Sequence, residues 1–204
     1  PSANLMPQCL ASSQQRYPDI RVILQDRAQQ SVLQNVRNAE VDFGIVIGPL
    51  ADADFDYEAI LQEPFLLLCH ENDELAQVER AEWSMLAGRN LVLQDYASGS
   101  RLLVDAALQQ LAIKVQVVQE IGHPATLFPM VEAGIGISVL PALALPLPSG
   151  RKLRVRRLYP EINRSLMLIK RKNRSLTPAA EAFWQEVRQQ ATLLTQQRAL
   201  KPAF

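Results

Sequence analysis

The sequence is poor in residue types that several classes of protein need. Only two of its 204 residues are cysteine and only two are histidine. Two cysteines are too few for a disulfide-stabilised scaffold, and two histidines leave little for a catalytic triad or a histidine-rich metal site. Basic and acidic residues number 21 each, so no net charge attracts the whole chain to nucleic acid. We therefore expect no cofactor, no metal site and no enzyme activity.

Long hydrophobic runs are also missing. No apolar stretch approaches the roughly 20 residues that a membrane-spanning helix requires. The first residues, from Pro1 to Asn4, do not resemble a secretion signal. The hydrophobic fraction of 48% is nevertheless typical of a globular protein with a buried core. These features predict a cytoplasmic protein without a membrane partner, in which Cys9 and Cys69 stay reduced.

Apolar residues alternate along the chain between helical and strand periodicity. Helices are expected over residues 5–16, 32–36, 102–111, 127–131 and from Thr177 and Pro178 onward. Strands are expected over residues 20–24, 41–47, 65–69, 90–94, 115–121, 135–140, 152–156 and 165–169. Alternation of this kind favours an α/β fold with mostly parallel sheets covered by helices.

Two motifs that suggest chemistry have plainer explanations. Gly134 and Gly136 resemble part of a dinucleotide-binding loop, but they follow a predicted helix and precede a strand, which reverses the order such a loop needs. A helix C-cap followed by a strand is favoured there. Residues 151–174 hold ten of the 21 basic residues, which is compatible with phosphate binding. The alternating charges of residues 152–156 instead favour the solvated face of an edge strand.

Polar turns precede four of the predicted helices. They contain Ser2 before the first helix, Gln29 before the second, Ser98 and Ser100 before the third, and His123, Pro124 and Thr126 before the fourth. Loops that follow parallel strands lie at the carboxyl ends of those strands, where open α/β folds bind ligands. Each helix start also offers free N–H groups that favour an anion. The alternative is ordinary capping, in which the hydroxyl groups only stabilise their own helices.

Several segments, in their order along the chain, resemble the effector-binding domain of LysR-type transcriptional regulators. They are Pro1-Ser2 ahead of a helix that ends in Arg16–Val22, the aspartate-led strand Val41–Ile45, Glu63–Leu68 and, most specifically, Val131–Pro141. The similarity extends from residue 1 to about residue 190. It implies a two-lobed type-2 periplasmic-binding-protein fold with a ligand cleft between the lobes. Lobe I would be residues 1–69 plus 166–204, and lobe II residues 70–165.

The same resemblance implies a function and a set of binding residues. The chain would be the small-molecule-sensing domain of a transcription regulator, without the family's N-terminal winged helix-turn-helix or the strand that precedes the Pro-Ser. Contacts to the effector carry over to Ser2, Gln29, Ser98, Ser100, His123, Pro124 and Thr126. Family members often have a small hydroxyl residue where Gln29 stands. Because helix starts and hydroxyl donors suit carboxylate oxygens, we expect a small anion or carboxylate as effector.

Expected partners follow from the resemblance as well. Family members pair their first helix with a lobe II helix of a second copy, here residues 4–16 with residues 125–133. We therefore expect a homodimer, and a tetramer is an alternative for the full-length protein. DNA would be bound only through the absent N-terminal domain. The main alternative is the solute-binding protein of a transporter, which shares this fold, and a dehydratase-like enzyme is the third.

Overall fold

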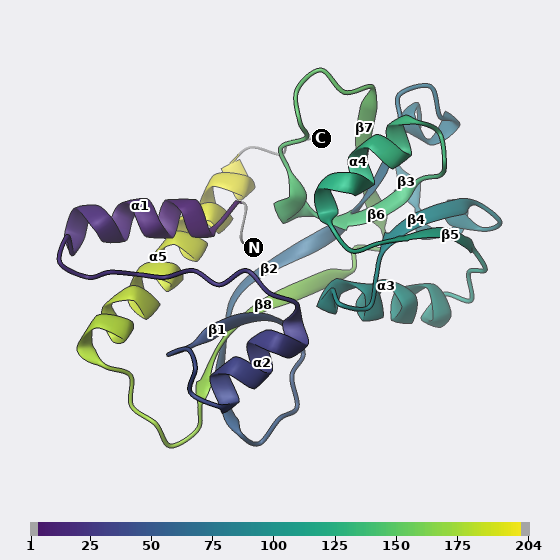
Figure 1. Cartoon of the computed structure of the whole chain (residues 1–204). Coiled ribbons are helices and arrows are strands. Elements are labelled where there is room, and N and C mark those ends of the chain that lie inside the picture. The colour runs from purple at the N-terminus through teal and green to yellow at the C-terminus, as the bar shows by residue number, and fades with distance from the viewer. Residues whose placement is uncertain (1–3, 201–204) are drawn as a thin grey trace. The chain divides into compact units, whose positions relative to one another are not determined.

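A computed structural model of the chain describes residues 4–200, with side chains as far as residue 197. The described residues form two compact units, of which unit 1 contains those up to Gln62 and from Ser165 onward, and unit 2 contains Glu63–Arg164. The chain passes between the units in two long strands, β2 (Phe55–His70) and β8 (Asn163–Arg171) (Figure 1). The expected lobe boundaries, after residues 69 and 165, lie later in both strands than the observed ones. Cys69, expected in lobe I, consequently belongs to unit 2.

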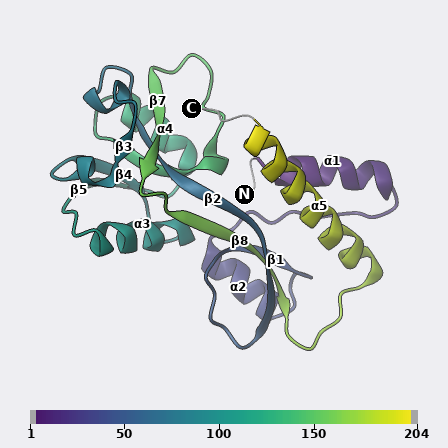
Figure 2. The same cartoon turned by 180° about the vertical axis from the view of Figure 1, so that it is seen from behind.

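In unit 1, a small sheet carries helices from both ends of the chain. The described strands follow the order β1–β8–β2, and β1 (Gly44–Gly48) runs antiparallel to β8. The helix α2 (Gln29–Arg37) packs its apolar side chains against this sheet. The helices α1 (Met6–Arg16) and α5 (Pro178–Leu200) lie side by side (Figure 2). Among the described residues, no helix is both long and apolar enough to cross a bilayer.

In unit 2, helices cover both faces of the sheet strands. Its further elements are β3 (Ala81–Glu82), β4 (Asn90–Gln94), α3 (Gly99–Gln110), β5 (Gln116–Ile121), α4 (Pro124–Glu132), β6 (Ser138–Pro141), β7 (Leu153–Tyr159) and the short 3-10 turns Glu74–Ala76, Trp83–Leu86 and Ala142–Ala144. The helix α3 shares one apolar cluster with Leu91 and Leu93 of β4, whereas α4 shares another with Val92. The two helices therefore lie on opposite faces of β4, as both views show (Figures 1 and 2).

The buried part of β2 shows why a continuous apolar run predicts a strand covered on both sides. Phe65, Leu67 and Cys69 point into the α3 cluster, and Leu66 and Leu68 point into the α4 cluster. The preceding ten residues of β2 were not predicted to form a strand, because they include exposed polar side chains and a proline, which usually argues against a strand.

The sheets are mixed rather than mostly parallel. The pairs β4–β5 and β3–β7 are parallel, in agreement with the helix–strand alternation of unit 2. The long strand β2 instead pairs antiparallel with β6 and with β7. The strand β2 leads the chain into unit 2, and β6 and β7 come near the end of its path there. Local periodicity does not report which strands pair.

The strand expected over residues 20–24 is not formed, and that prediction was wrong. The segment is extended but pairs with no strand of the described chain, and Ile23 is 70% exposed. A β-branched sequence becomes a strand only when a neighbour accepts its backbone hydrogen bonds. The expected strand over 41–47 likewise begins later, at Gly44.

The Gly134 and Gly136 motif has the structural role that the sequence favoured. Gly134 follows α4 with a left-handed φ of +76°, and the amide of Ile135 donates to the carbonyl of Met130 at 3.2 Å. This arrangement closes the helix as a glycine C-cap. A Cβ atom at Gly136 would lie 2.5 Å from the carbonyl oxygen of Asn90, so only glycine fits there. The dinucleotide-loop interpretation is therefore not supported.

Candidate functional site

The turn between β4 and α3 contains Ser98, which caps its own helix. Its hydroxyl oxygen accepts from the amide of Ser100 at 3.3 Å and donates to Oε1 of Gln94 at 3.0 Å. The hydroxyl hydrogen is thus already used within the protein. Of the two readings that the sequence left open, capping describes the observed contacts of Ser98.

Ser100 does not cap α3 and is held by a buried ion pair instead. The side chain is 3% exposed, and its hydroxyl oxygen accepts a hydrogen bond from Nη1 of Arg164. Arg164 in turn donates from Nε and Nη2 to Oε1 of Glu63, at 2.9 and 2.7 Å. Burial lowers the pKa of the Arg164 guanidinium, and the Glu63 carboxylate opposes that shift. Oε2 of Glu63 accepts from the amide of Leu143.

The turn at the start of α4 contains three of the expected binding residues, His123, Pro124 and Thr126. His123 is the N-cap residue, yet it makes no capping hydrogen bond, and both His123 and Pro124 are exposed. Thr126 is half-buried, and no hydrogen bond of its hydroxyl is seen within residues 4–200. Pro124 has no N–H, and the amide of Thr126 donates to the carbonyl of His123 at 2.9 Å, so Ala125 is the residue of this first turn whose N–H has no partner among the described residues. Thr126 presents an unengaged hydroxyl beside it.

Gln29 lies in unit 1, and its side chain is engaged with the backbone. Its amide oxygen accepts from the amide of Ile47 at 2.8 Å, and its amide nitrogen donates to the carbonyl of Ile47 at 3.3 Å. The Gln29 side chain thus makes the same pair of hydrogen bonds to Ile47 that a residue of an adjacent strand would make at the edge of β1. Ser2, the remaining expected contact, lies outside the described residues.

Arg101 fixes the turn before α3, although no pattern in the sequence singles it out. It is 5% exposed, donates from Nη1 to the carbonyl of Gln94 at 2.8 Å, and pairs with Asp105 and Glu120. Its guanidinium carbon lies 4.3 Å from the ring centre of Tyr96. Burial alone would lower the pKa of Arg101, but the hydrogen bonds to Asp105 and Glu120 raise it. The arginine remains charged, and its hydrogen bonds hold the loop before α3 in place.

The structure adds one acid, Asp95, at the carboxyl ends of β4 and β5. Its Oδ1 accepts from the amide of Ala97 at 3.0 Å, and its own amide donates to the carbonyl of Ile121. A Cβ atom at Gly122 would lie 3.2 Å from Oδ2, so the carboxylate reaches the turn that leads to α4. The sequence analysis passed over this residue, which lies just after the strand expected over residues 90–94. A ligand here would meet an acceptor as well as donors.

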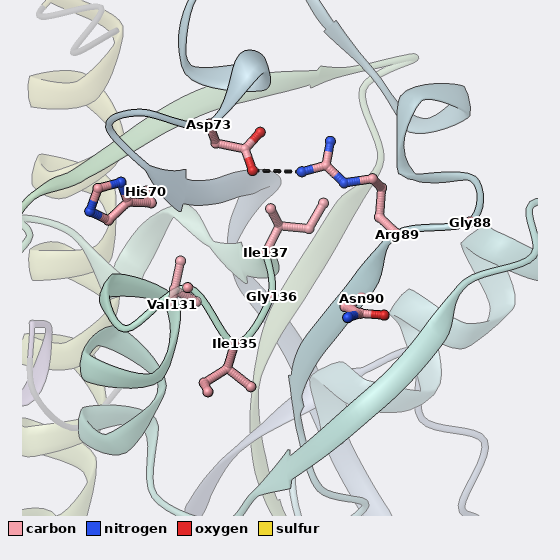
Figure 3. A pocket seen from close by; sticks show the side chains of 10 residues that line it. His70, Asp73, Gly88, Arg89, Asn90, Val131, Ile135, Gly136 and Ile137 are labelled. Atoms are coloured by element: carbon pink, nitrogen blue, oxygen red, sulfur yellow. Dashed lines mark hydrogen bonds and ion pairs between the residues drawn. The ribbon is translucent and has the colours of Figure 1, made fainter.

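Unit 2 also contains a pocket of about 320 Å³ that none of the expected binding residues lines. Its walls include His70, Asp73, Arg89 and Ile135, and Asp73 pairs with Arg89 across one side (Figure 3). The pocket lies at the amino end of β4 and beyond the last turn of α4. It therefore occupies the opposite end of these elements from the turns that contain Ser98, Ser100 and Thr126.

Several arginines of the basic segment 151–174 are engaged by contacts within the protein. Arg151 pairs with Glu132 at 2.5 Å, and Arg154 pairs with Glu71 at 3.3 Å. Arg156 donates to the carbonyls of Ala76 and Val78. These contacts favour a structural role over a phosphate-binding one. Within residues 4–200 no group of three or more His, Cys, Asp or Glu side chains is arranged for a metal ion.

Comparison with known proteins shows to which family the chain belongs. The profile of the LysR substrate binding domain matches residues 1–192. The chain belongs to this family. The resemblance seen in the sequence is thus confirmed, and with it the type-2 periplasmic-binding-protein fold, built here from mixed sheets flanked by helices.

Relatives and solved structures of the LysR family agree with this assignment. An HTH-type transcriptional regulator of Shigella flexneri, YfeR, is 58% identical over the whole chain, which spans 66% of that protein's length. The regulatory domain of Synechocystis CcmR in complex with 2-PG superposes with a TM-score of 0.83 at 22% identity, covering 92% of this chain and 91% of that one. The effector-binding domain of QuiR in complex with shikimate gives 0.83 at 19% identity, covering 94% and 92%. A solute-binding role in transport is not favoured by these relatives.

Proposed function

We propose that the chain is the effector-binding part of a LysR-type transcriptional regulator, and that it controls the DNA-binding part of the longer protein. The observation that carries this proposal is the family match over residues 1–192, together with 58% identity to a transcriptional regulator. A ligand can change the activity of such a protein only by binding one of its conformations more tightly than another. The effector therefore acts as a switch rather than as a substrate, and no enzyme activity is proposed.

The polar groups of unit 2 favour a small carboxylate that also carries a hydrogen-bond donor. The hydroxyl of Thr126 and the backbone N–H of Ala125 supply donors for the carboxylate oxygens. Ser100 lies at the start of α3, and Asp95 supplies an acceptor for a hydroxyl or amine group. His123 and Pro124 border the same turn. Gln29 and Ser98 are weaker candidates, because their side chains already bond to the protein.

The remaining proposals rest on the family alone. The regulator would work in the cytoplasm as a homodimer, without a metal or cofactor, and would contact DNA through a winged helix-turn-helix outside this chain. Curated relatives are longer than the chain, which spans 66% of one and 57% of another.

The experiment that tests the proposed function has two parts. Isothermal titration of the chain with a panel of small hydroxy and amino carboxylates should identify a ligand, whereas the matching neutral alcohols and simple amines should not bind. The longer protein should then change its affinity for operator DNA when the same compound is added. Binding of only neutral or cationic compounds would overturn the ligand class, and operator binding that ignores every ligand found would overturn the regulatory role.

A further inference from the structure

Ser98 and Ser100, two residues apart at the start of α3, have opposite hydrogen-bonding polarity. The hydroxyl of Ser98 donates its hydrogen to Gln94, so only a lone pair is left. The hydroxyl of Ser100 accepts from Arg164, so its hydrogen must be directed elsewhere. No acceptor for that hydrogen is seen in the described part of the chain. Ser100 is therefore the serine of this turn that has a donor to offer.

Arg164 fixes this polarity because a guanidinium group can only donate. Ser100 can meet Arg164 solely through an oxygen lone pair, whichever way the hydroxyl rotates. The guanidinium itself cannot turn away, since Nε and Nη2 both donate to Glu63. Glu63 is held at its other oxygen by the amide of Leu143. This relay joins residues of β2, β8, the turn at 142–144 and α3, and the residues that form it all belong to unit 2.

We infer that Arg164 is a positioning residue that occupies one lone pair of Ser100 and turns its hydroxyl hydrogen toward the effector, and thereby favours an acceptor such as a carboxylate or phosphate oxygen at this point. The inference deepens the proposed function and rests on it. The ion pair of Glu63 and Arg164 carries no net charge, so the pair selects the effector through hydrogen-bond direction. The positive end of α3 adds to that preference for an anion.

The variants must remove the donor without leaving a buried charge. Arg164→Met alone would leave the charged Glu63 carboxylate in the core without its guanidinium partner, and this could unfold the protein. The double variant Glu63→Met with Arg164→Met removes both charges, keeps the net charge unchanged and frees Ser100 to accept or donate. Glu63→Gln is the second variant, since it retains Arg164 and its bond to Ser100. It leaves the guanidinium charge in the core, so its fold is checked by circular dichroism before the titration.

The binding test compares acetate with acetamidine, two molecules of the same shape of which one only accepts and the other only donates. NMR titration would follow the amide signals of Ser100 and Thr126 in each protein. For the wild type, acetate should bind at least about tenfold more tightly than acetamidine, as one charge-assisted hydrogen bond allows. In the double variant the ratio should fall below about threefold, while Glu63→Gln should keep the wild-type ratio or exceed it. An unchanged ratio in a folded double variant would overturn the inference.

A second measurement does not depend on any ligand. Neutron diffraction from deuterated crystals of the wild type should show the Ser100 deuterium directed away from Arg164 and bonded to water. A deuterium bonded to a carbonyl or carboxylate of the protein would leave no donor for an effector and would overturn the inference. If neither probe binds the wild type, the proposed ligand class fails, and the neutron result still decides the role of Arg164.

Discussion

Thr126 and Ser98 carry similar hydroxyl groups at the starts of neighbouring helices, yet only Ser98 uses its hydroxyl to cap. We expect Thr126→Ala to weaken carboxylate binding by about 1–3 kcal/mol through a lost charge-assisted hydrogen bond. The free energy of unfolding should change by less than about 0.5 kcal/mol, because no intramolecular bond is removed. Titration calorimetry and urea unfolding measure the two effects.

Ser98→Ala is the matched control for Thr126→Ala. It should lower the free energy of unfolding by about 1 kcal/mol through loss of the cap. A Thr126 variant that loses stability but binds ligand normally would show that Thr126 is structural. The same result would remove the main donor from the proposed site.

Gly136 shows a requirement that no local pattern of the sequence reveals. The neighbouring carbonyl of Asn90 accepts from the amide of Ile137 at 2.9 Å, and a Cβ at 136 would come within 2.5 Å of that oxygen. Because the clash is with backbone, Gly136→Ala should cost about 1–3 kcal/mol of unfolding free energy. Gly122→Ala serves as control, since its new Cβ would meet only the movable side chain of Asp95. Equal losses for both variants in urea unfolding would contradict this explanation.

The candidate site could be predicted from the sequence only in outline. Polar turns before helices, together with the family resemblance, identified seven residues as one group. Five of them lie at two helix starts of unit 2, Gln29 lies in unit 1 and Ser2 lies outside the described residues. The partners that distinguish these residues come from distant parts of the chain, and periodicity carries no information about them. Arg164 reaches Ser100 across 64 positions of sequence, so its contact depends on the tertiary fold.

At the level of elements, amphipathic periodicity predicted the helices well because each helix buries one face against other elements of its own unit. Strands were harder to predict. Residues 20–24 have strand-forming side chains but find no partner in the described chain, and residues 55–64 form a strand despite polar residues and Pro64. Strand formation depends on a neighbour that local sequence does not specify.

The contact between α1 and α5 contains a buried carboxylate that makes it sensitive to acid. Glu186 is 2% exposed and accepts from Arg16 at 3.1 Å and from Gln190 at 2.8 Å. Burial alone would raise the pKa of Glu186, but its hydrogen-bond donors lower it below the ordinary value of 4.5. The ionised carboxylate therefore contributes its full stability above pH 4.5, and this contribution is lost as the pH falls through the lower folded pKa.

The corresponding prediction compares Glu186→Gln with the wild type in urea unfolding between about pH 6 and about pH 3. The wild type should lose more stability over the acidic part of this range, and the variant should show a shallower dependence. Glu58→Gln is the control, because Glu58 forms an exposed pair with Arg188, and such pairs contribute little to stability. Identical profiles for Glu186→Gln and the wild type would rule out Glu186 as the source.

At the scale of the whole molecule, the family implies a homodimer in which α1 of one copy meets α4 of the other. Ala11 on α1 and Ala125 on α4 are exposed in the structure. Light scattering at micromolar concentration should therefore give the mass of two chains. Ala11→Arg should shift the mass toward one chain by placing a charge in the contact, whereas Arg188→Ala on α5 should not. A wild type that remains monomeric would contradict the dimer.

The two cysteines lie in different units, so the reactivity of each thiol measures the opening of its own unit. Cys9 lies in α1 of unit 1 and Cys69 in β2 of unit 2, and both are fully buried. Burial, with Glu186 nearby, raises the pKa of Cys9 to about 12, and burial with Asp73 nearby raises that of Cys69 to about 11. Because only the thiolate reacts, both thiols should remain unmodified by a disulfide reagent at about pH 8 in the native protein.

Both thiols should react once urea unfolds the chain, and the native rates should rise as the pH approaches the raised pKa values, Cys69 ahead of Cys9. Labelling followed by peptide mass spectrometry assigns each rate to its cysteine. The order follows from the smaller pKa shift of Cys69, provided that both thiols react from the folded state. If one unit opens before the other, its cysteine will react at a rate independent of pH at high reagent concentration, since opening then limits the reaction. Formation of a Cys9–Cys69 disulfide within one chain on peroxide treatment would contradict the prediction, because it would bring together two thiols that belong to different units.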